Sequence, residues 1–165
     1  MAWQSRVTVA VVVEREGKFL LVEEDIENWD VPVFNQPAGH VEQGETLIEA
    51  ARREALEETG WEVEVTDLLG FYTYTPPNAA GEYTYYRVCF VAKPVRHFNQ
   101  PLDEGIIRAV WMTLEELESS HHARSPLVAR CLRDYLSGRR LPLDLIYEHP
   151  ATEVWTGSSP ATPSF

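Results

Sequence analysis

The chain has 165 residues, enough for one compact domain with an apolar core but hardly for two. Apolar residues make up 44% and charged residues 24%, and no stretch approaches the roughly 18 apolar residues of a membrane helix, so the composition predicts a globular protein without a membrane span. The formal net charge of −12 argues against a nucleic-acid polymer as partner, but not against a small phosphorylated substrate that arrives with Mg²⁺.

The first half of the chain predicts strands followed by a capped helix. Residues 6–13 (RVTVAVVV) and 18–24 (KFLLVEE) are β-branched or apolar runs joined by EREG, which predicts a hairpin rather than a signal peptide. Residues 25–38 contain two prolines and predict a loop. Thr46 and Glu49 have capping-box spacing, apolar residues then recur at helical spacing, and Gly60 is well placed to end that helix.

The second half predicts further strands and two short helices. Strands are expected over 62–75, 82–93 and 109–112, and helices over 114–119 and from Pro126 to Gly138. The order β-β-α-β-β-β-α-α indicates an α/β domain over residues 5–145, with helices packed on a mixed sheet, followed by a loosely structured tail over 146–165. Cys89 and Cys131 lack metal-ligand spacing, which favours a cytoplasmic protein with reduced thiols.

The predicted first helix carries an unusual acidic face. Glu54, Glu57 and Glu58 stand at positions i, i+3 and i+4, so a helix places all three carboxylates on one side, where like charges repel. A hard cation reverses that cost, because Mg²⁺ takes oxygen ligands and bridges carboxylates to substrate phosphates. A solvated surface helix is the alternative reading of the triplet taken alone.

The surrounding residues resemble a family motif. Fixed positions of the pattern Gx5Ex7REUxEExGU, the Nudix box, are matched by Gly39, Glu45, Arg53, Glu54, Glu57, Glu58 and Gly60. Ala55 and Trp61 depart from it at two packing positions. The chain therefore resembles a Nudix hydrolase, which implies the Nudix fold, a mixed sheet sandwiched between α-helices.

The resemblance also implies roles for the matched residues. Glu54, Glu57, Glu58 and the Gly39 carbonyl would bind Mg²⁺, with Mn²⁺ as the alternative ion, and Arg53 would hold the acids in register, Glu45 among them. In this family a water attacks a phosphorus of a diphosphate-containing substrate. The general base varies in position, and the candidates are Glu58, Glu104 in the loop PLDEGIIRAVW, and its neighbour Asp103.

A closer resemblance bears on the substrate. The segments RVTVAVVVEREGKFLLVEE, NQPAGHVEQGETLIEAARREALEETG and RSPLVARCLRDYLSGRRLPL are similar to the NudJ-type phosphatase branch. This similarity implies hydrolysis of nucleoside tri- and diphosphates and of the pyrophosphate of the thiamine pyrimidine precursor. Pro76 and Pro77 lie where ADP-ribose pyrophosphatases tend to carry a proline, so ADP-ribose or a nucleotide sugar is the alternative substrate.

Aromatic side chains near the site would bind the ring of such a substrate by stacking. The candidates are Phe34 and Tyr74, with Trp29 and Tyr72 as others, and Arg87 is a candidate phosphate contact. A silent Nudix domain used as a ligand-sensing module would usually lack a glutamate of the box, and here every one is present. The sequence predicts no particular oligomeric state.

Overall fold

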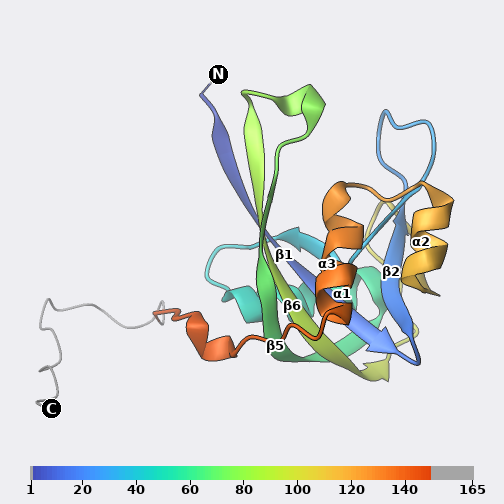
Figure 1. Cartoon of the computed structure of the whole chain (residues 1–165), viewed down its shortest axis with the longest axis vertical. Coiled ribbons are helices and arrows are strands. Elements are labelled where there is room, and N and C mark those ends of the chain that lie inside the picture. Colours follow the sequence, from blue (N-terminus) through green and yellow to red (C-terminus); the bar gives the residue numbers. More distant parts are fainter. Residues whose placement is uncertain (1, 150–165) are drawn as a thin grey trace, which may run out of the picture.

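The structure, a computed structural model, describes residues 2–149 (Figure 1). Its strands are β1 (Gln4–Arg15), β2 (Lys18–Glu24), β3 (Val33–Asn35), β4 (Ala38–His40), β5 (Trp61–Tyr74), β6 (Tyr83–His97) and β7 (Ile106–Met112). Its helices are α1 (Leu47–Thr59), α2 (Leu114–Ser120) and α3 (Pro126–Leu136), with 3₁₀ turns η1 (Pro77–Ala79) and η2 (Leu143–Leu145).

The seven strands form one mixed sheet, in the order β3-β2-β1-β6-β5. β4 pairs with β1 and β7 pairs with β2, outside that path. The long pair β1–β6 is parallel, from Gln4–Tyr83 to Val13–Ala92, and the other pairs are antiparallel. The predicted hairpin exists only at its turn, because β1 pairs with β2 through Glu14–Phe19 and Arg15–Lys18, whereas the preceding part of β1 pairs with β6.

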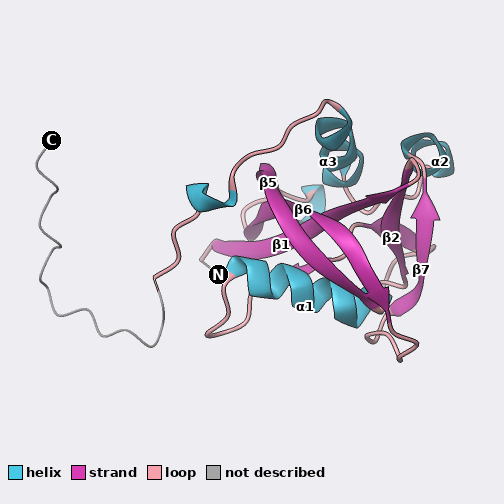
Figure 2. Cartoon of the chain, turned by 90° about the horizontal axis from the view of Figure 1, so that it is seen from below, coloured by secondary structure: helices cyan, strands magenta, loops and turns pink. Residues whose placement is uncertain are grey.

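Alternation along β1 divides the core into two layers. Val9, Val11 and Val13 face one side of the sheet, where they pack with the alanines of α1, while Ala10 and Val12 face α2 and α3. Since successive side chains on a strand point to opposite faces, the VTVAVVV run supplies both layers at once. Figure 2 shows α1 on one side of the sheet and α2 and α3 on the other. The expected mixed sheet between helices is confirmed.

Two expectations need adjustment. The segment 25–38, expected as a loop, contains β3 and the start of β4, strands of three residues each that are too short to show a period in the sequence. The expected tail also begins with contacts to the domain: Ile146 packs against the core and the Glu148 carboxylate accepts a hydrogen bond from the Leu47 N–H. The remainder of that tail, 150–165, lies outside the described residues.

Among residues 2–149, no helix has the length and apolar character needed to span a bilayer.

Candidate active site

Helix α1 is fixed at both ends, and this sets the direction of its acidic face. Thr46 and Glu49 form the expected capping box, with the Glu49 N–H donating to Thr46 Oγ1 at 3.1 Å. At the other end Gly60 takes the left-handed conformation, φ 74°, and its N–H donates to the Leu56 carbonyl. Between these caps, Glu54 and Glu58 are buried against the sheet side of the helix and Glu57 is half-exposed.

Gly39 on β4 gives Glu54 its place. A Cβ atom added to Gly39 would lie 2.1 Å from Glu54 Oε1, far inside van der Waals contact. Only glycine therefore allows the Glu54 carboxylate to approach β4 this closely. The sequence predicted a role for the Gly39 carbonyl, and the structure adds a steric reason for a glycine at this position.

Arg53 connects the acids of the box. Its guanidinium donates to both carboxylate oxygens of Glu45, at 3.0 and 2.6 Å, in a bidentate pair. It also donates to Glu54 at 2.9 Å and Glu57 at 3.1 Å, and to the His40 carbonyl on β4. These bonds raise the pKa of Arg53 and lower that of Glu45. The contact with Glu45 is the one expected from the sequence.

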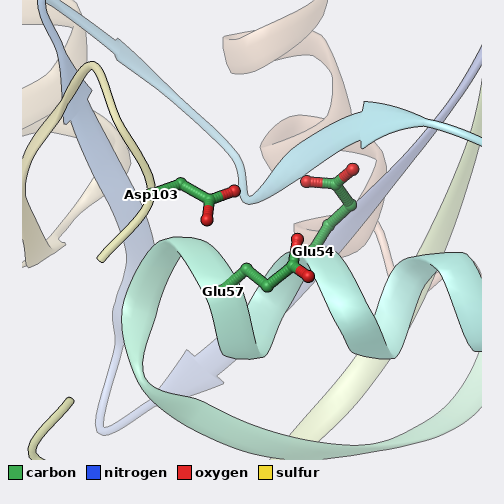
Figure 3. Close-up of side chains that lie close together, drawn as sticks. All are labelled: Glu54, Glu57 and Asp103. Carbon is green, nitrogen blue, oxygen red and sulfur yellow. The ribbon is translucent and has the colours of Figure 1, made fainter. Parts of the chain in front are cut away.

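Three carboxylates come together at the exposed end of this network. Oxygen atoms of Glu54, Glu57 and Asp103 lie within 4.8 Å of one another. Figure 3 shows the two glutamates extending from α1 and Asp103 reaching toward them from the loop before β7. The Asp103 N–H donates to the Glu57 carbonyl at 3.0 Å, so the backbone of this loop is tied to the end of α1.

Glu58 occupies a different environment. Its side chain is 4% exposed, and within residues 2–149 its Oε2 has no hydrogen-bond partner, while Oε1 accepts only a long bond from the Ala38 N–H. Burial, followed by the neighbouring carboxylates of Glu54 and Glu24, raises the pKa of Glu58 well above its usual range. A cation bound nearby would give such a carboxylate a partner.

The loop acid that joins the cluster is Asp103, not Glu104. Glu104 is exposed and belongs to no group of metal-ligand type among the described residues. The sequence placed both acids at this loop, but neighbouring residues in a loop point in different directions, and only the backbone bond to Glu57 decides which one faces the helix.

The arrangement fits a hard divalent cation. Clustered carboxylate oxygens are the ligands that Mg²⁺ and Mn²⁺ take, and an unsatisfied buried carboxylate beside them is costly without a positive charge. Glu54, Glu57 and Asp103 meet the first condition and Glu58 the second. The site is therefore a candidate metal centre built from α1, β4 and the loop before β7.

A pocket of about 620 Å³ borders the same glycine. It lies over β1, β4, β5 and β6, and its lining includes Ala38, Gly39 and His40 on the side of the acidic cluster. Among the predicted substrate contacts, Tyr74, Trp29 and Arg87 line it, as do Pro76, Pro77 and Asn78. Tyr83 and Tyr85, whose rings meet edge to face at 5.3 Å, add aromatic surface that the sequence analysis did not single out.

Two of the aromatic candidates lie elsewhere. Phe34 packs into the core beneath α2 and α3, and the Tyr72 hydroxyl donates to Asp134 at 2.8 Å in that same layer. Both are therefore packing residues and do not line the pocket. The alternation of side chains along β3 and β5 decides which of them face the core, and the bulges in β5 make that alternation hard to predict from the sequence.

Glu24 and Arg124 are charged residues near the site that the analysis of motifs missed. Glu24 ends β2, is 7% exposed, and accepts a hydrogen bond from Arg124 Nη1 at 2.8 Å. Burial raises the pKa of Glu24, and Arg124 opposes that rise. The signal for this pair was weak, because an acid at the end of a strand usually faces water.

Comparisons with known proteins agree with this geometry. A family model for the NUDIX domain matches residues 4–131. Phosphatase NudJ from Escherichia coli strain K12 is 40% identical over 145 residues, which is 87% of this chain and 92% of that protein. A NUDIX hydrolase of known structure from Nitrosomonas europaea has 40% sequence identity and a TM-score of 0.83, covering 90% of this chain and 100% of that one.

A more distant structure shares the fold alone. An ADP-ribose pyrophosphatase from Streptococcus suis is 17% identical with a TM-score of 0.61, covering 81% of this chain and 90% of that one. The match to the family extends over most of the chain and includes the metal-type cluster, Arg53 and the glycines around it. The chain belongs to the Nudix hydrolases, enzymes that act on phosphoric anhydrides.

Proposed function

We propose that the chain is a Mg²⁺-dependent hydrolase that removes phosphate from nucleoside tri- and diphosphates and from related diphosphates, such as that of the thiamine pyrimidine precursor. The observation that carries this proposal is the position of the carboxylate cluster beside a pocket lined by aromatic rings and arginines. The similarity to a protein named Phosphatase NudJ supports release of phosphate. The proposed partner is a small molecule, and the proposed location is the cytoplasm, where the buried thiols of Cys89 and Cys131 stay reduced.

In this proposal the acidic residues and Arg53 have different roles. Glu54, Glu57 and Asp103 hold Mg²⁺, or Mn²⁺ in its place, with Glu58 and the Gly39 carbonyl as further ligands. When bound, the metal supplies charge stabilisation at the phosphoryl oxygens and lowers the pKa of a bound water. Arg53 keeps Glu45, Glu54 and Glu57 in position through its hydrogen bonds.

The general base needs a carboxylate that the metal does not use. Asp103 contributes an oxygen to the cluster and Glu58 is buried, whereas Glu104, the next residue along the loop from Asp103, is exposed and outside the cluster. We therefore propose Glu104 as the group whose carboxylate accepts the proton of the attacking water, with Asp103 as a ligand. Glu104→Gln should lower kcat and leave Mg²⁺ affinity unchanged, while Asp103→Asn should weaken Mg²⁺ affinity. Full turnover by Glu104→Gln would remove Glu104 from the mechanism.

The substrate is tested with a panel and identified products. Nucleoside tri- and diphosphates, the thiamine pyrimidine diphosphate and ADP-ribose are offered with Mg²⁺, and products are separated by chromatography. We expect orthophosphate from the first three kinds of substrate. ADP-ribose is the second candidate because Pro76 and Pro77 line the pocket, and cleavage of ADP-ribose to AMP and ribose phosphate, in preference to the others, would favour it.

Glu57→Gln tests the metal assignment. It removes one charge from the cluster at a half-exposed position, so folding should be retained while kcat/KM falls by about 100-fold or more, since a catalytic metal contributes several kcal/mol. Glu64→Gln is the matched control, because Glu64 is an exposed acid on β5 outside the cluster. Wild-type turnover by Glu57→Gln, still dependent on Mg²⁺, would show that the assignment is wrong.

A further inference from the structure

Two arginines line the pocket, and they are bound in different ways. Arg87 on β6 is 9% exposed, and its Nη1 and Nη2 donate to Gln36 Oε1 at 3.0 Å and Asn35 Oδ1 at 3.3 Å. Each terminal nitrogen therefore donates one hydrogen bond to a neutral side chain in a buried position. This arginine helps to build the floor of the pocket.

The Arg124 guanidinium makes fewer hydrogen bonds than that of Arg87 within the described residues. Within residues 2–149 its guanidinium makes one hydrogen bond, from Nη1 to the buried carboxylate of Glu24, although a guanidinium carries five N–H donors. Its side chain is 38% exposed, against 9% for that of Glu24. The planar fork of arginine suits two-point contact with a phosphate.

The position of Arg124 is fixed from two directions. Its backbone N–H donates to the Phe34 carbonyl at 2.9 Å, which joins the segment before α3 to β3. Glu24 then holds one side of the guanidinium, so little side-chain entropy remains to be lost on binding a ligand. The adjoining residues Ser125 and Leu127 also line the pocket.

The charges around the pocket indicate where an anion would lie. The protein as a whole carries a net charge of −12, yet Arg87 and Arg124 both line this pocket, whose β4 side borders the carboxylate cluster through Gly39. A phosphate chain held between the cluster and these arginines would have cations on both sides once the metal is bound. The aromatic rings of Tyr74, Tyr83 and Tyr85 would remain for the rest of the substrate.

We propose that Arg124 is a substrate-binding residue that donates its free guanidinium N–H groups to non-bridging oxygens of the substrate's phosphate chain, and that buried Glu24 positions it. The inference rests on the proposed function, since it concerns the same pocket. It gives the segment RSPLVARCLRDYLSGRRLPL a functional reason, because that segment begins at Arg124. In this role Arg87 is a positioning residue for the pocket floor.

The experiment compares Arg124→Gln with a control that has the same local chemistry. Arg108 pairs with Glu23, the residue next to Glu24, but both side chains lie outside the pocket and Arg108 is 62% exposed. We expect Arg124→Gln to raise KM for the hydrolysed diphosphate about 10- to 100-fold with kcat changed less than about threefold, as for loss of a charge-assisted hydrogen bond made equally in ground and transition states. Arg108→Gln should keep the wild-type KM, and Arg124→Lys should fall between.

A double variant separates binding from simple charge compensation. Arg124→Gln leaves Glu24 buried without its partner, which by itself disturbs the site or the fold. Glu24→Gln combined with Arg124→Gln removes both charges, and thermal unfolding reports whether each variant is folded. If Arg124 binds phosphate, the double variant keeps the raised KM. Recovery of the wild-type KM in the double variant would overturn the inference.

A binding measurement gives the same comparison without turnover. The probe is α,β-methylene-ADP, whose bridging carbon replaces the hydrolysable oxygen, titrated calorimetrically in the presence of Mg²⁺. Arg124→Gln should weaken its affinity about 10- to 100-fold relative to Arg108→Gln. Equal affinity in the two variants, or no binding to the wild type, would overturn the inference. Failure of the wild type to hydrolyse any member of the panel would instead contradict the proposed function.

Discussion

At the scale of single residues, Glu58 has the most unusual environment. Its carboxylate is buried beside Glu54 and Glu24, and its Oε2 has no hydrogen-bond partner among the described residues. A buried carboxylate without a cation binds a proton more tightly than the same group in the unfolded chain, whose ordinary pKa is 4.5. The folded protein without metal therefore retains a proton that the unfolded chain releases.

The first prediction follows from this sign. Because the folded pKa of Glu58 is raised, the folded state binds more protons than the unfolded state above pH 4.5, so the free energy of unfolding of the metal-free protein should fall as the pH rises from about 5 through the neutral range. The raised pKa of Glu24 acts in the same direction. Urea unfolding in EDTA at several pH values measures this slope.

Glu58→Gln is the matched variant for that measurement. It is isosteric and carries no titrating proton, so the decline with pH should become shallower. The pKa values of Glu45 and Asp134 are lowered in the folded protein, so protonation of these groups destabilises it only when the solution is made more acidic than the range used. An unchanged slope in Glu58→Gln would assign the pH dependence to other groups.

At the scale of elements, the unit formed by β4 and α1 carries the site. Its geometry depends on how α1 ends, because the chain must turn sharply into β5 immediately after the last ligand-bearing turn. Gly60 makes this turn with φ 74°, and the Phe98 N–H donates to the Gly60 carbonyl at 2.8 Å. The end of β6 thus lies directly against the helix terminus.

The second prediction concerns this turn. A Cβ atom at Gly60 would lie 2.6 Å from the Phe98 carbonyl oxygen, whereas at Gly44, φ 82°, it would meet nothing within 4 Å. Both substitutions to alanine impose the cost of the left-handed conformation, roughly 1–2 kcal/mol. The loss of unfolding free energy should be about 1–3 kcal/mol larger for Gly60→Ala than for Gly44→Ala, because the new Cβ at Gly60 also forces β6 away from the helix. Equal losses in chemical denaturation would contradict the close approach.

At the scale of the whole molecule, one buried amide joins distant segments of the chain next to the pocket. Gln36 is fully buried between β3 and β4, and its Nε2 donates to the Val128 carbonyl in α3 at 2.7 Å. Its Oε1 accepts from Arg87 on β6. One amide therefore links a helix, a strand and the connection between two short strands, which are far apart in the sequence.

The third prediction tests this link. Gln36→Leu keeps a similar volume but leaves Arg87 with one fewer partner in a buried position, so unfolding free energy should fall by about 2–4 kcal/mol. Gln100→Leu is the control, since Gln100 Nε2 also donates to a backbone carbonyl, that of Leu56, but at an exposed position. A change of about 0.5 kcal/mol is expected there. A similar effect of both substitutions would mean that the buried amide adds nothing.

The acidic helix and the pocket of the candidate site could not be predicted equally well from the sequence. Contacts within one helix follow from a period of 3.6 residues, so the common face of Glu54, Glu57 and Glu58 and the reach of Arg53 back to its neighbours could be predicted from spacing. The caps at Thr46 and Gly60 are equally local. Residue types at fixed spacing within one helix therefore predict its caps and its acidic face, but not how deeply each acid is buried.

The pocket depends on contacts between distant segments. Phe34 was expected at the site but lies in the core, and Arg124 and Glu24, a hundred residues apart, were not expected to meet. Their positions follow from the pairing of β2 with β3 and from the hydrogen bond of the Arg124 N–H to the Phe34 carbonyl, and no local pattern specifies contacts between segments so far apart in the sequence.

The sequence by itself therefore determined the family, the acidic helix face and the class of reaction, because the box is a local pattern that lies within one loop and one helix. Only the tertiary structure decided that Asp103 and not Glu104 faces that helix, that Glu58 is buried, and which side chains line the pocket. The physical reason is that these features depend on the closing of long loops and on the register of the sheet, and both are set by the packing of the whole chain.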